Sequence, residues 1–168
     1  MKTLVIHPFD ITTGFLEDIY INHDWTIIDT NVSHKIMKDS IKSHNRIIML
    51  GHGSDLGLLG FGRYMIDSKL VYLLREKDCI CIWCNANMFV EKYKLKGFYT
   101  GMIISEYEEA VYCDVNTTLE EIYISNVLFA DSIKKSITQL QILDEMLKHY
   151  TGDSNVIMYN RNNLYETD

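Results

Sequence analysis

The fold is decided by two stretches of sequence, Arg46-Ile-Ile-Met-Leu-Gly-His-Gly-Ser54 and Cys79-Ile-Cys-Ile-Trp-Cys-Asn-Ala-Asn87. Each is a short apolar run, rich in isoleucine and bounded by glycine or polar residues, which is typical of a strand buried on both faces. Residues 67–77 lie between them and predict a helix, with Asp67 or Ser68 as the cap and basic residues near the end. A strand, a helical crossover and a second strand place two parallel strands side by side.

His52 and Cys84 stand at the ends of these two strands. The carboxyl ends of adjacent parallel strands lie at one edge of a sheet, about 4.8 Å apart in the pairing direction, and ligands bind at this edge of an open α/β sheet. A thiol and an imidazole within hydrogen-bond reach form the pair that a cysteine nucleophile requires. The sequence therefore predicts a His52–Cys84 dyad. The alternative is that Cys84 is a small buried hydrophobe and His52 a polar strand end.

Strands and helices alternate along most of the chain, which is the pattern of a parallel sheet. The predicted strands cover residues 3–7, 25–29, 46–51, 79–83 and 98–105, in the spatial order 2-1-3-4-5, with residues 155–159 as an edge strand beyond the fifth. The predicted helices cover residues 14–20, 33–43, 67–77, 86–94 and 117–136. Two shorter ones are a helix that starts at Ser105 and an amphipathic helix over residues 140–150. We therefore expect an α/β fold, a three-layer sandwich with a mostly parallel central sheet.

Two segments depart from this alternation. Residues 56–66 carry glycines among apolar residues and predict a small β-hairpin. Residues 161–168 are polar, and we expect them to form a loose tail. No internal repeat or linker divides the chain, so we expect a single domain over residues 1–168.

The chain is acidic, with a net charge of −7 and no basic cluster. Because such a domain repels phosphate backbones, we expect no general nucleic-acid binding. No apolar run reaches the length of a membrane span, and His7 and Pro8 interrupt the apolar start, so we expect neither a membrane anchor nor a signal peptide. These features predict a cytoplasmic protein whose four cysteines are reduced thiols.

The groups next to the dyad could complete a catalytic site. The backbone N–H groups of Gly53 and Cys84 could together hold an oxyanion, as acyl transfer requires. A helix is predicted to start just after Cys84, and its positive end, together with a nearby imidazolium, would lower the pKa of the thiol. Asp10 and Asp55 could line the same edge of the sheet or simply sit in polar turns.

The order of these parts resembles the caspase-like fold of cysteine peptidases, the group of caspases, metacaspases, gingipains and CHAT-domain peptidases. The resemblance covers residues 46–109: an apolar strand ending in His52-Gly53, a glycine-containing hairpin, a helix, and an apolar strand ending in Cys84. It implies that His52 is the general base or acid, that Cys84 is the nucleophile, and that the Gly53 and Cys84 amides form the oxyanion hole. It also implies that the region of Glu106 lines the pocket for the side chain before the scissile bond.

An acid at Glu106 would favour a basic substrate residue, although acids at this point could equally complement a helix dipole. Trp83 would border a substrate groove beside Cys84. Cys79, Cys81 and Cys84 lack the paired spacing of a structural zinc site, and no phosphate-binding signature is present. We therefore expect no metal and no cofactor.

Two functions remain open on this basis. The first is a caspase-like cysteine peptidase, which the joint placement of His52-Gly53 and Cys84 favours. The second is a non-catalytic binding module of the same fold that senses or sequesters a small nucleotide-like or peptide ligand, which the short chain and the bulky Trp83 favour. The substrate or ligand and the oligomeric state are left open.

Overall fold

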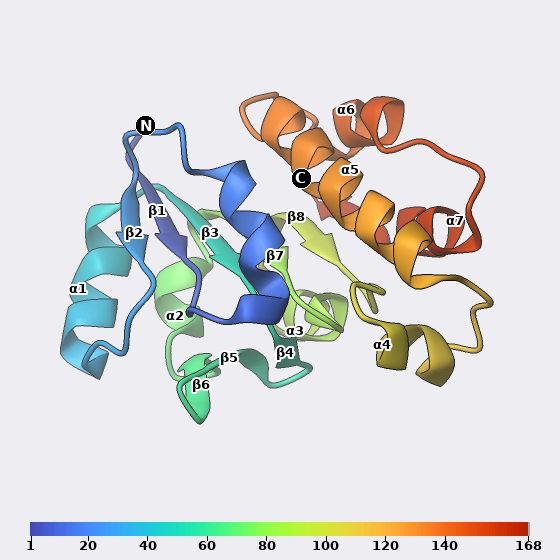
Figure 1. The fold of residues 1–168 in the computed structure, drawn as a ribbon. Helices are drawn as coiled ribbons and strands as arrows, with labels where there is room; N and C mark the ends of the chain where they lie inside the picture. The colour runs from blue at the N-terminus through green and yellow to red at the C-terminus, as the bar shows by residue number, and fades with distance from the viewer. Residues whose placement is uncertain (168) are drawn as a thin grey trace.

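The centre of the molecule is a six-stranded sheet in the order β2-β1-β3-β7-β8-β9, seen here in a computed structural model that describes residues 1–167 (Figure 1). The strands are β1 (Thr3–Ile6), β2 (Thr26–Ile28), β3 (Arg46–Leu50), β7 (Asp78–Ile82), β8 (Lys96–Thr100) and β9 (Leu164–Thr167). The first five are parallel to one another, and β9 runs antiparallel to β8. The α/β class and the predicted strand order 2-1-3-4-5 are therefore confirmed.

Helices cover both faces of this sheet, so the molecule has three layers (Figure 1). One face packs against α1 (His34–Ser43), α2 (Val71–Leu74) and α3 (Ala86–Tyr93), and the other against η1 (Ile11–Ile19), α5 (Leu119–Ser136), α6 (Ile142–His149) and α7 (Asn155–Arg161). Successive side chains of a strand point to opposite faces. In β3, Ile47 and Met49 accordingly belong to the first core and Ile48 and Leu50 to the second, which is why these strands read as continuous apolar runs.

Residues 155–159 form a helix, and their prediction as an edge strand was wrong. They belong to α7, whose cap Ser154 accepts a hydrogen bond from the Ile157 N–H. The side chain of Asn160, in the same helix, is buried. It accepts a hydrogen bond from the Ile104 N–H at 2.8 Å and donates one to the Ile104 carbonyl at 2.9 Å. The edge of the sheet is instead occupied by β9, within the segment that was expected to be a loose tail.

Several predicted boundaries shift along the chain. The fifth strand, expected at residues 98–105, is β8 and ends at Thr100, and the crossover helix expected at residues 67–77 is reduced to α2. The sequence predicts capping boxes at Ser105–Glu108 and Thr117–Glu120. The structure forms each of them one residue later, at Glu106–Glu109 before α4 (Tyr107–Tyr112) and at Thr118–Glu121 before α5. None of the helices within residues 1–167 combines the length and the apolar character needed to cross a membrane.

A second, three-stranded antiparallel sheet follows β3, where the sequence predicted a hairpin. It consists of β4 (Gly53–Ser54), β5 (Gly57–Gly60) and β6 (Arg63–Ile66). The indole of Trp83 fixes its start, because a Cβ atom on Gly53 would lie only 2.2 Å from Cδ1 of Trp83. The indole N–H also donates to the carbonyl of Ser54 at 2.9 Å. This small sheet therefore holds the segment that contains His52.

Candidate active site

His52 and Cys84 line the same small cavity, as expected for residues that follow two adjacent parallel strands. The cavity has a volume of about 30 Å³, which is room for roughly one water molecule. Its other walls come from η1, from the ends of β3 and β7, from the segment after β8 and from the helices that follow it. They are Thr13, Phe15, Leu16, Gly51, Ile82, Trp83, Ile103, Ser105, Glu109 and Phe129. The structure thus brings both residues of the predicted dyad to the walls of one small cavity.

The ring of His52 is held by two residues at the start of η1. Thr12 Oγ1 lies 2.7 Å from His52 Nε2 and 2.6 Å from Asp10 Oδ1. The ionised carboxylate of Asp10 can only accept, so the single hydroxyl proton of Thr12 goes to Asp10. His52 must then donate its Nε2–H to Thr12, which leaves Nδ1 as the basic nitrogen of the neutral ring. A base oriented by a third group is a feature of nucleophilic sites.

Asp10 is placed by the backbone as well as by Thr12. It caps η1 by accepting the Thr12 N–H at 2.9 Å, and its carboxylate lies 3.6 Å from His52 Nε2. The hydrogen bonds from the side chain and backbone of Thr12 lower the pKa of Asp10. Of the two predicted aspartates, Asp10 therefore belongs to the site, whereas Asp55 is exposed in the turn between β4 and β5 and does not line the cavity.

The thiol of Cys84 contacts other groups than the imidazole. Its sulfur lies 3.4 Å from the carbonyl oxygen of Ile103 and 3.5 Å from Oε1 of Glu109. Burial, and next the Glu109 carboxylate, raise the pKa of Cys84 to about 12. The expectation of a lowered thiol pKa was wrong, because the sulfur faces a carboxylate and a carbonyl in a dry environment. At neutral pH the thiol is protonated.

The sequence places Glu106, Glu108 and Glu109 next to the site and favours Glu106, but Glu109 is the one of these acids that contacts Cys84. Its Oε2 accepts three hydrogen bonds, from the Ser105 N–H, the Ser105 hydroxyl and the Glu106 N–H, at 2.7 to 3.1 Å. Its Oε1 receives only the weak thiol donor of Cys84 among the described residues. The capping box of Glu106 and Glu109 fixes this side chain, and α4 packs with Ile104, Ile122 and Val156 so that Glu109 contacts Cys84.

Glu106 stands beside Glu109 as the cap of α4 and is half-buried. Burial and then the charge of Glu109 raise the pKa of Glu106, and the charges of His52 and Asp10 also act on it. Glu109 therefore contacts Cys84 and Asp10 contacts His52, whereas Glu106 does not line the cavity and acts on it only through its charge. This electrostatic environment favours a cation.

The N–H groups of Gly53 and Cys84, which were predicted to hold an oxyanion, make no hydrogen bond to a neighbouring strand among the described residues. In β4 and β5, the Leu59 N–H donates to the carbonyl of His52 at 2.8 Å, and Gly53 lies opposite Leu58 in the next, non-hydrogen-bonded position. That register turns the Gly53 N–H away from β5. The Cys84 N–H makes no hydrogen bond within residues 1–167. Trp83, predicted to border the substrate, is 2% exposed and serves mainly as the support of Gly53.

His7 supports η1 from behind the site. It directly follows β1, is buried, and its ring nitrogens lie 2.9 Å from the Tyr20 hydroxyl and 3.1 Å from Thr13 Oγ1. Burial lowers the pKa of His7 to about 4, although the charges of Asp29 and Asp10 oppose this. His7 is therefore neutral at physiological pH and acts as a polar link between β1 and η1.

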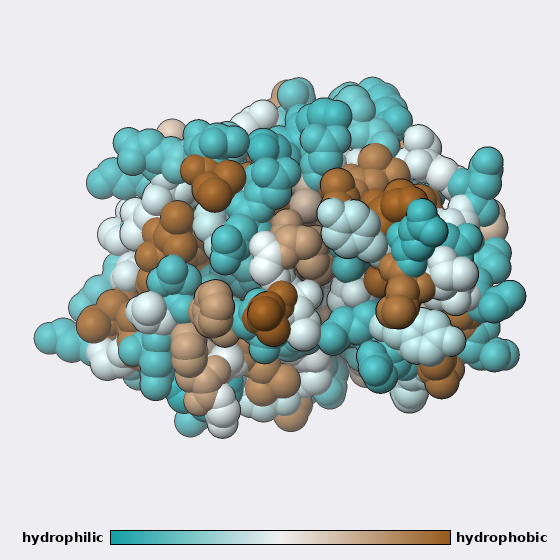
Figure 2. All heavy atoms as spheres, in the orientation of Figure 1, coloured by the Kyte–Doolittle hydropathy of each residue, from teal (hydrophilic) through white to brown (hydrophobic). Residues whose placement is uncertain are grey.

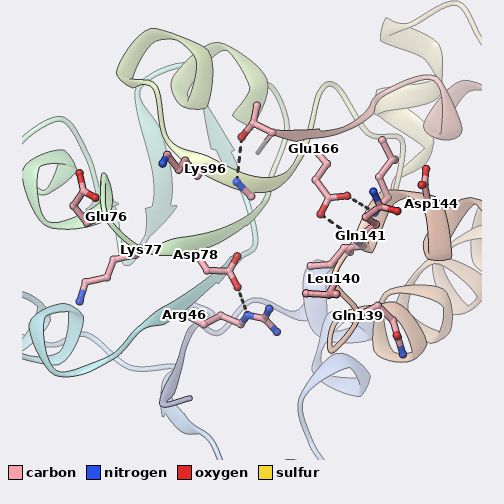
Figure 3. A pocket seen from close by; sticks show the side chains of 14 residues that line it. Arg46, Glu76, Lys77, Asp78, Lys96, Gln139, Leu140, Gln141, Asp144 and Glu166 are labelled. Carbon is pink, nitrogen blue, oxygen red and sulfur yellow. Dashed lines mark hydrogen bonds and ion pairs between the residues drawn. The ribbon is translucent and has the colours of Figure 1, made fainter.

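A larger cleft lies at the opposite edge of the sheet, at the amino ends of β3, β7 and β8, and has a volume of about 530 Å³. Figure 3 shows one ion pair in this cleft, between Arg46 and Asp78, and shows Glu166 bonded to backbone N–H groups. Arg46 binds Asp78 at 2.6 Å and the carbonyl of Ile137 at 2.5 Å, and Glu166 accepts the first N–H groups of α6. No predicted site residue lies there, and these contacts join β3, β7 and β9 to the α5–α6 connection.

Within the part of the chain that the structure describes, no group of three or more histidine, cysteine, aspartate or glutamate side chains is arranged to hold a metal ion. The thiols of Cys79 and Cys81 are buried inside β7, apart from the cavity. No protein-family model, curated protein or solved structure matches this chain.

Proposed function

We propose that this chain is a cysteine peptidase of caspase-like architecture in which Cys84 is the nucleophile and His52 carries the proton. The observation that carries the proposal is the cavity that these two residues line at the carboxyl ends of β3 and β7. The Thr12–Asp10 pair supports it further, because it fixes His52 in the tautomer with a free Nδ1.

The reaction follows from these groups. His52 Nδ1 accepts the proton of the Cys84 thiol, and the sulfur attacks the peptide carbonyl carbon. The N–H groups of Gly53 and Cys84 hold the oxyanion. The C–N bond then breaks, His52 protonates the leaving amine, and the acyl group stays on Cys84 as a thioester. A water molecule, deprotonated by His52, hydrolyses the thioester to a carboxylic acid and restores the thiol.

A basic residue before the cut is the substrate feature that the surrounding carboxylates support. An ammonium or guanidinium group near Glu106 and Glu109 would gain charge-assisted hydrogen bonds. It would also offset the charge that keeps the Cys84 thiol protonated. With a pKa of about 12, only roughly one thiol in 100,000 is ionised at pH 7. Binding of a basic substrate and formation of the thiolate are therefore coupled in this proposal.

Hydrolysis of a peptide library with lysine or arginine at varied positions tests the proposal. Cys84→Ala should abolish cleavage, and His52→Ala should abolish it to a similar extent, because residues that act as one unit are not additive. Cys113→Ala is the matched control, since Cys113 is also a half-buried free thiol and does not line the cavity. Cleavage that survives in Cys84→Ala, or no cleavage of any peptide, contradicts the proposal.

A second function is favoured by the small cavity and the protonated thiol. In that case the same edge of the sheet binds a peptide or small molecule without chemistry. A thiol-reactive peptide with a basic residue separates the two functions. The peptidase is supported if the basic peptide labels Cys84 faster than a matched acidic peptide does. This labelling must also be lost in His52→Ala. Reversible binding with unreacted Cys84 supports the binding module.

A further inference from the structure

A second cleft, of about 290 Å³, adjoins His52 and is separate from the cavity of Cys84. It lies between the loop after β1 and the turn that joins β5 to β6. Its lining residues are Pro8, Phe9, Asp10, His52, Leu59, Gly60, Phe61, Gly62 and Arg63. Among the residues that line these two spaces, His52 is common to both, so the imidazole is a shared wall of the cavity and the cleft.

Large apolar side chains are exposed around the cleft. Phe9 is 72% exposed, Phe61 is 43% exposed and Leu59 is 36% exposed. Figure 2 shows apolar side chains gathered over the start of η1 and the β5–β6 hairpin. Single exposed hydrophobic residues are ordinary, but a group of them around a concave site marks a place where ligands bind.

Phe61 occupies a backbone conformation that disfavours a bulky residue. Gly60 pairs with Arg63, so Phe61 and Gly62 form a two-residue turn, with φ values of +53° and +73°. A turn with two positive φ angles ordinarily takes asparagine or aspartate followed by glycine. An aromatic residue at the first position is strained, and strained residues of this kind cluster at functional sites.

The strained turn is held in place from both sides. A Cβ atom on Gly60 would lie 2.4 Å from the ring of Pro8, which shows how closely the hairpin packs against the loop after β1. Arg63 donates to the side chain of Asn31 at 3.0 Å and to the carbonyl of Val32 at 2.6 Å. Phe61 is therefore presented at the cleft on a rigid support.

We infer that this cleft binds the residue on the leaving side of the cut, with an apolar or aromatic side chain between Phe9 and Phe61 and the released amino group beside Asp10. The inference rests on the proposed peptidase function. The acyl half of the substrate stays on Cys84, whereas the leaving amine takes its proton from His52, and the cleft is the space that His52 lines without Cys84. The Asp10 carboxylate on its wall complements the charge of the ammonium group that forms.

Binding of the leaving-side product can be measured without catalysis. The probe is the dipeptide Phe-Ala amide, titrated into ¹⁵N-labelled Cys84→Ala protein. We expect the amide signals of Gly60 and Gly62 to shift. N-acetyl-Phe-Ala amide, which lacks the ammonium group, and Ser-Ala amide, which lacks the aromatic ring, should each bind about tenfold more weakly.

The variant Phe61→Asn separates recognition from folding. Asparagine tolerates positive φ, so the melting temperature should stay unchanged or rise. Affinity for Phe-Ala amide should fall about tenfold, because the apolar contact is lost. Tyr72→Ser, at an exposed aromatic residue outside the cleft, is the matched control and should bind as the parent does.

The outcomes distinguish this inference from the proposed function. Shifts of the Gly60 and Gly62 amide signals that are lost in Phe61→Asn support binding at the cleft, even if no peptide is cleaved. The absence of cleavage would then count against the peptidase alone. Cleavage that has no preference for an apolar residue after the cut, together with no shift on adding Phe-Ala amide, overturns the inference and leaves the peptidase standing.

Discussion

Cys84 Sγ lies 3.5 Å from Oε1 of Glu109, and this carboxylate is the side chain to which the thiol donates. The other oxygen of Glu109 accepts the N–H groups of Ser105 and Glu106, just before α4, so the carboxylate cannot easily turn away. The resting thiol of Cys84 is therefore hydrogen-bonded to Glu109, whereas the imidazole of His52 is hydrogen-bonded to Thr12. Catalysis at this site requires that the first of these two contacts be broken or neutralised.

Glu109→Gln should make Cys84 more reactive. The substitution removes the negative charge that raises the thiol pKa, whereas burial, the larger cause, remains, so the pKa should fall but stay above its ordinary value. Glutamine can still serve in the capping box. Alkylation of Cys84 by iodoacetamide, followed by mass spectrometry, should speed up by up to about tenfold at pH 8. Glu108→Gln, at an exposed acid of the same helix, should leave the rate unchanged, and an unchanged rate in Glu109→Gln would contradict the prediction.

Thr12→Val should release the ring of His52. Valine keeps the shape of threonine but removes the hydroxyl that accepts the Nε2–H and donates to Asp10. Histidine ¹⁵N spectra should show a mixture of tautomers, and peptide hydrolysis should fall about ten- to a hundredfold because the base is no longer oriented. Thr26→Val frees another histidine, His44, whose Nε2 lies 2.9 Å from Thr26 Oγ1 away from the site. This control should leave hydrolysis intact, and equal losses in both variants would point to a general effect on folding.

Folding stability should decline between pH 6.5 and pH 4 because of His7. Its pKa is about 4 in the folded state and 6.5 when unfolded, so in this window the unfolded chain binds more protons. Acid therefore favours unfolding, and the contribution lost from above pH 6.5 to below pH 4 is about 3 kcal/mol. Urea unfolding at several pH values measures it. His7→Gln should flatten this part of the profile, whereas His34→Gln, at an exposed histidine, should retain the full slope.

Gly53→Ala should destabilise the protein by about 2 kcal/mol or more, since overpacking forces neighbouring groups to move. The new Cβ atom would lie 2.2 Å from the Trp83 ring and 2.5 Å from the carbonyl oxygen of Gly57, and the second of these is backbone. Gly14→Ala is the matched control, because nothing lies within 4 Å of its Cβ position. Chemical denaturation compares the two, and equal midpoints would show that Trp83 does not fix Gly53 tightly.

The central sheet could be predicted from sequence because its strands are buried on both faces. Continuous apolar runs such as residues 46–50 and 78–82 can be recognised locally, and alternation with helices leaves few possible strand orders. The strand at the edge beyond β8 could not be predicted in this way. Val156, Ile157 and Met158 are apolar enough for a strand, but the Ser154 cap and the pairing of Asn160 with Ile104 select a helix. The second of these is a contact between distant segments.

The candidate site was predictable to the same degree. His52 and Cys84 end two strands, and the end of a strand fixes the edge at which a side chain lies. The direction of the side chain depends on what packs against it. Glu109 reaches Cys84 from α4, Thr12 reaches His52 from η1, and Phe61 gains its position from a turn whose sequence does not resemble the usual asparagine-glycine. These contacts depend on tertiary packing, which no local pattern encodes.

The packing of Trp83 beneath Gly53 gives the protein an optical reporter of its own. Trp83 is 2% exposed, adjoins Cys84 in sequence, and its indole N–H is bonded to Ser54. The chain has two tryptophans, and the other, Trp25, stacks on His23 with ring centroids 3.8 Å apart. Emission from Trp83 should lie at shorter wavelength than emission from the half-buried Trp25. Changes at the nucleophile can therefore be followed by intrinsic fluorescence, without attaching a dye near the reacting groups.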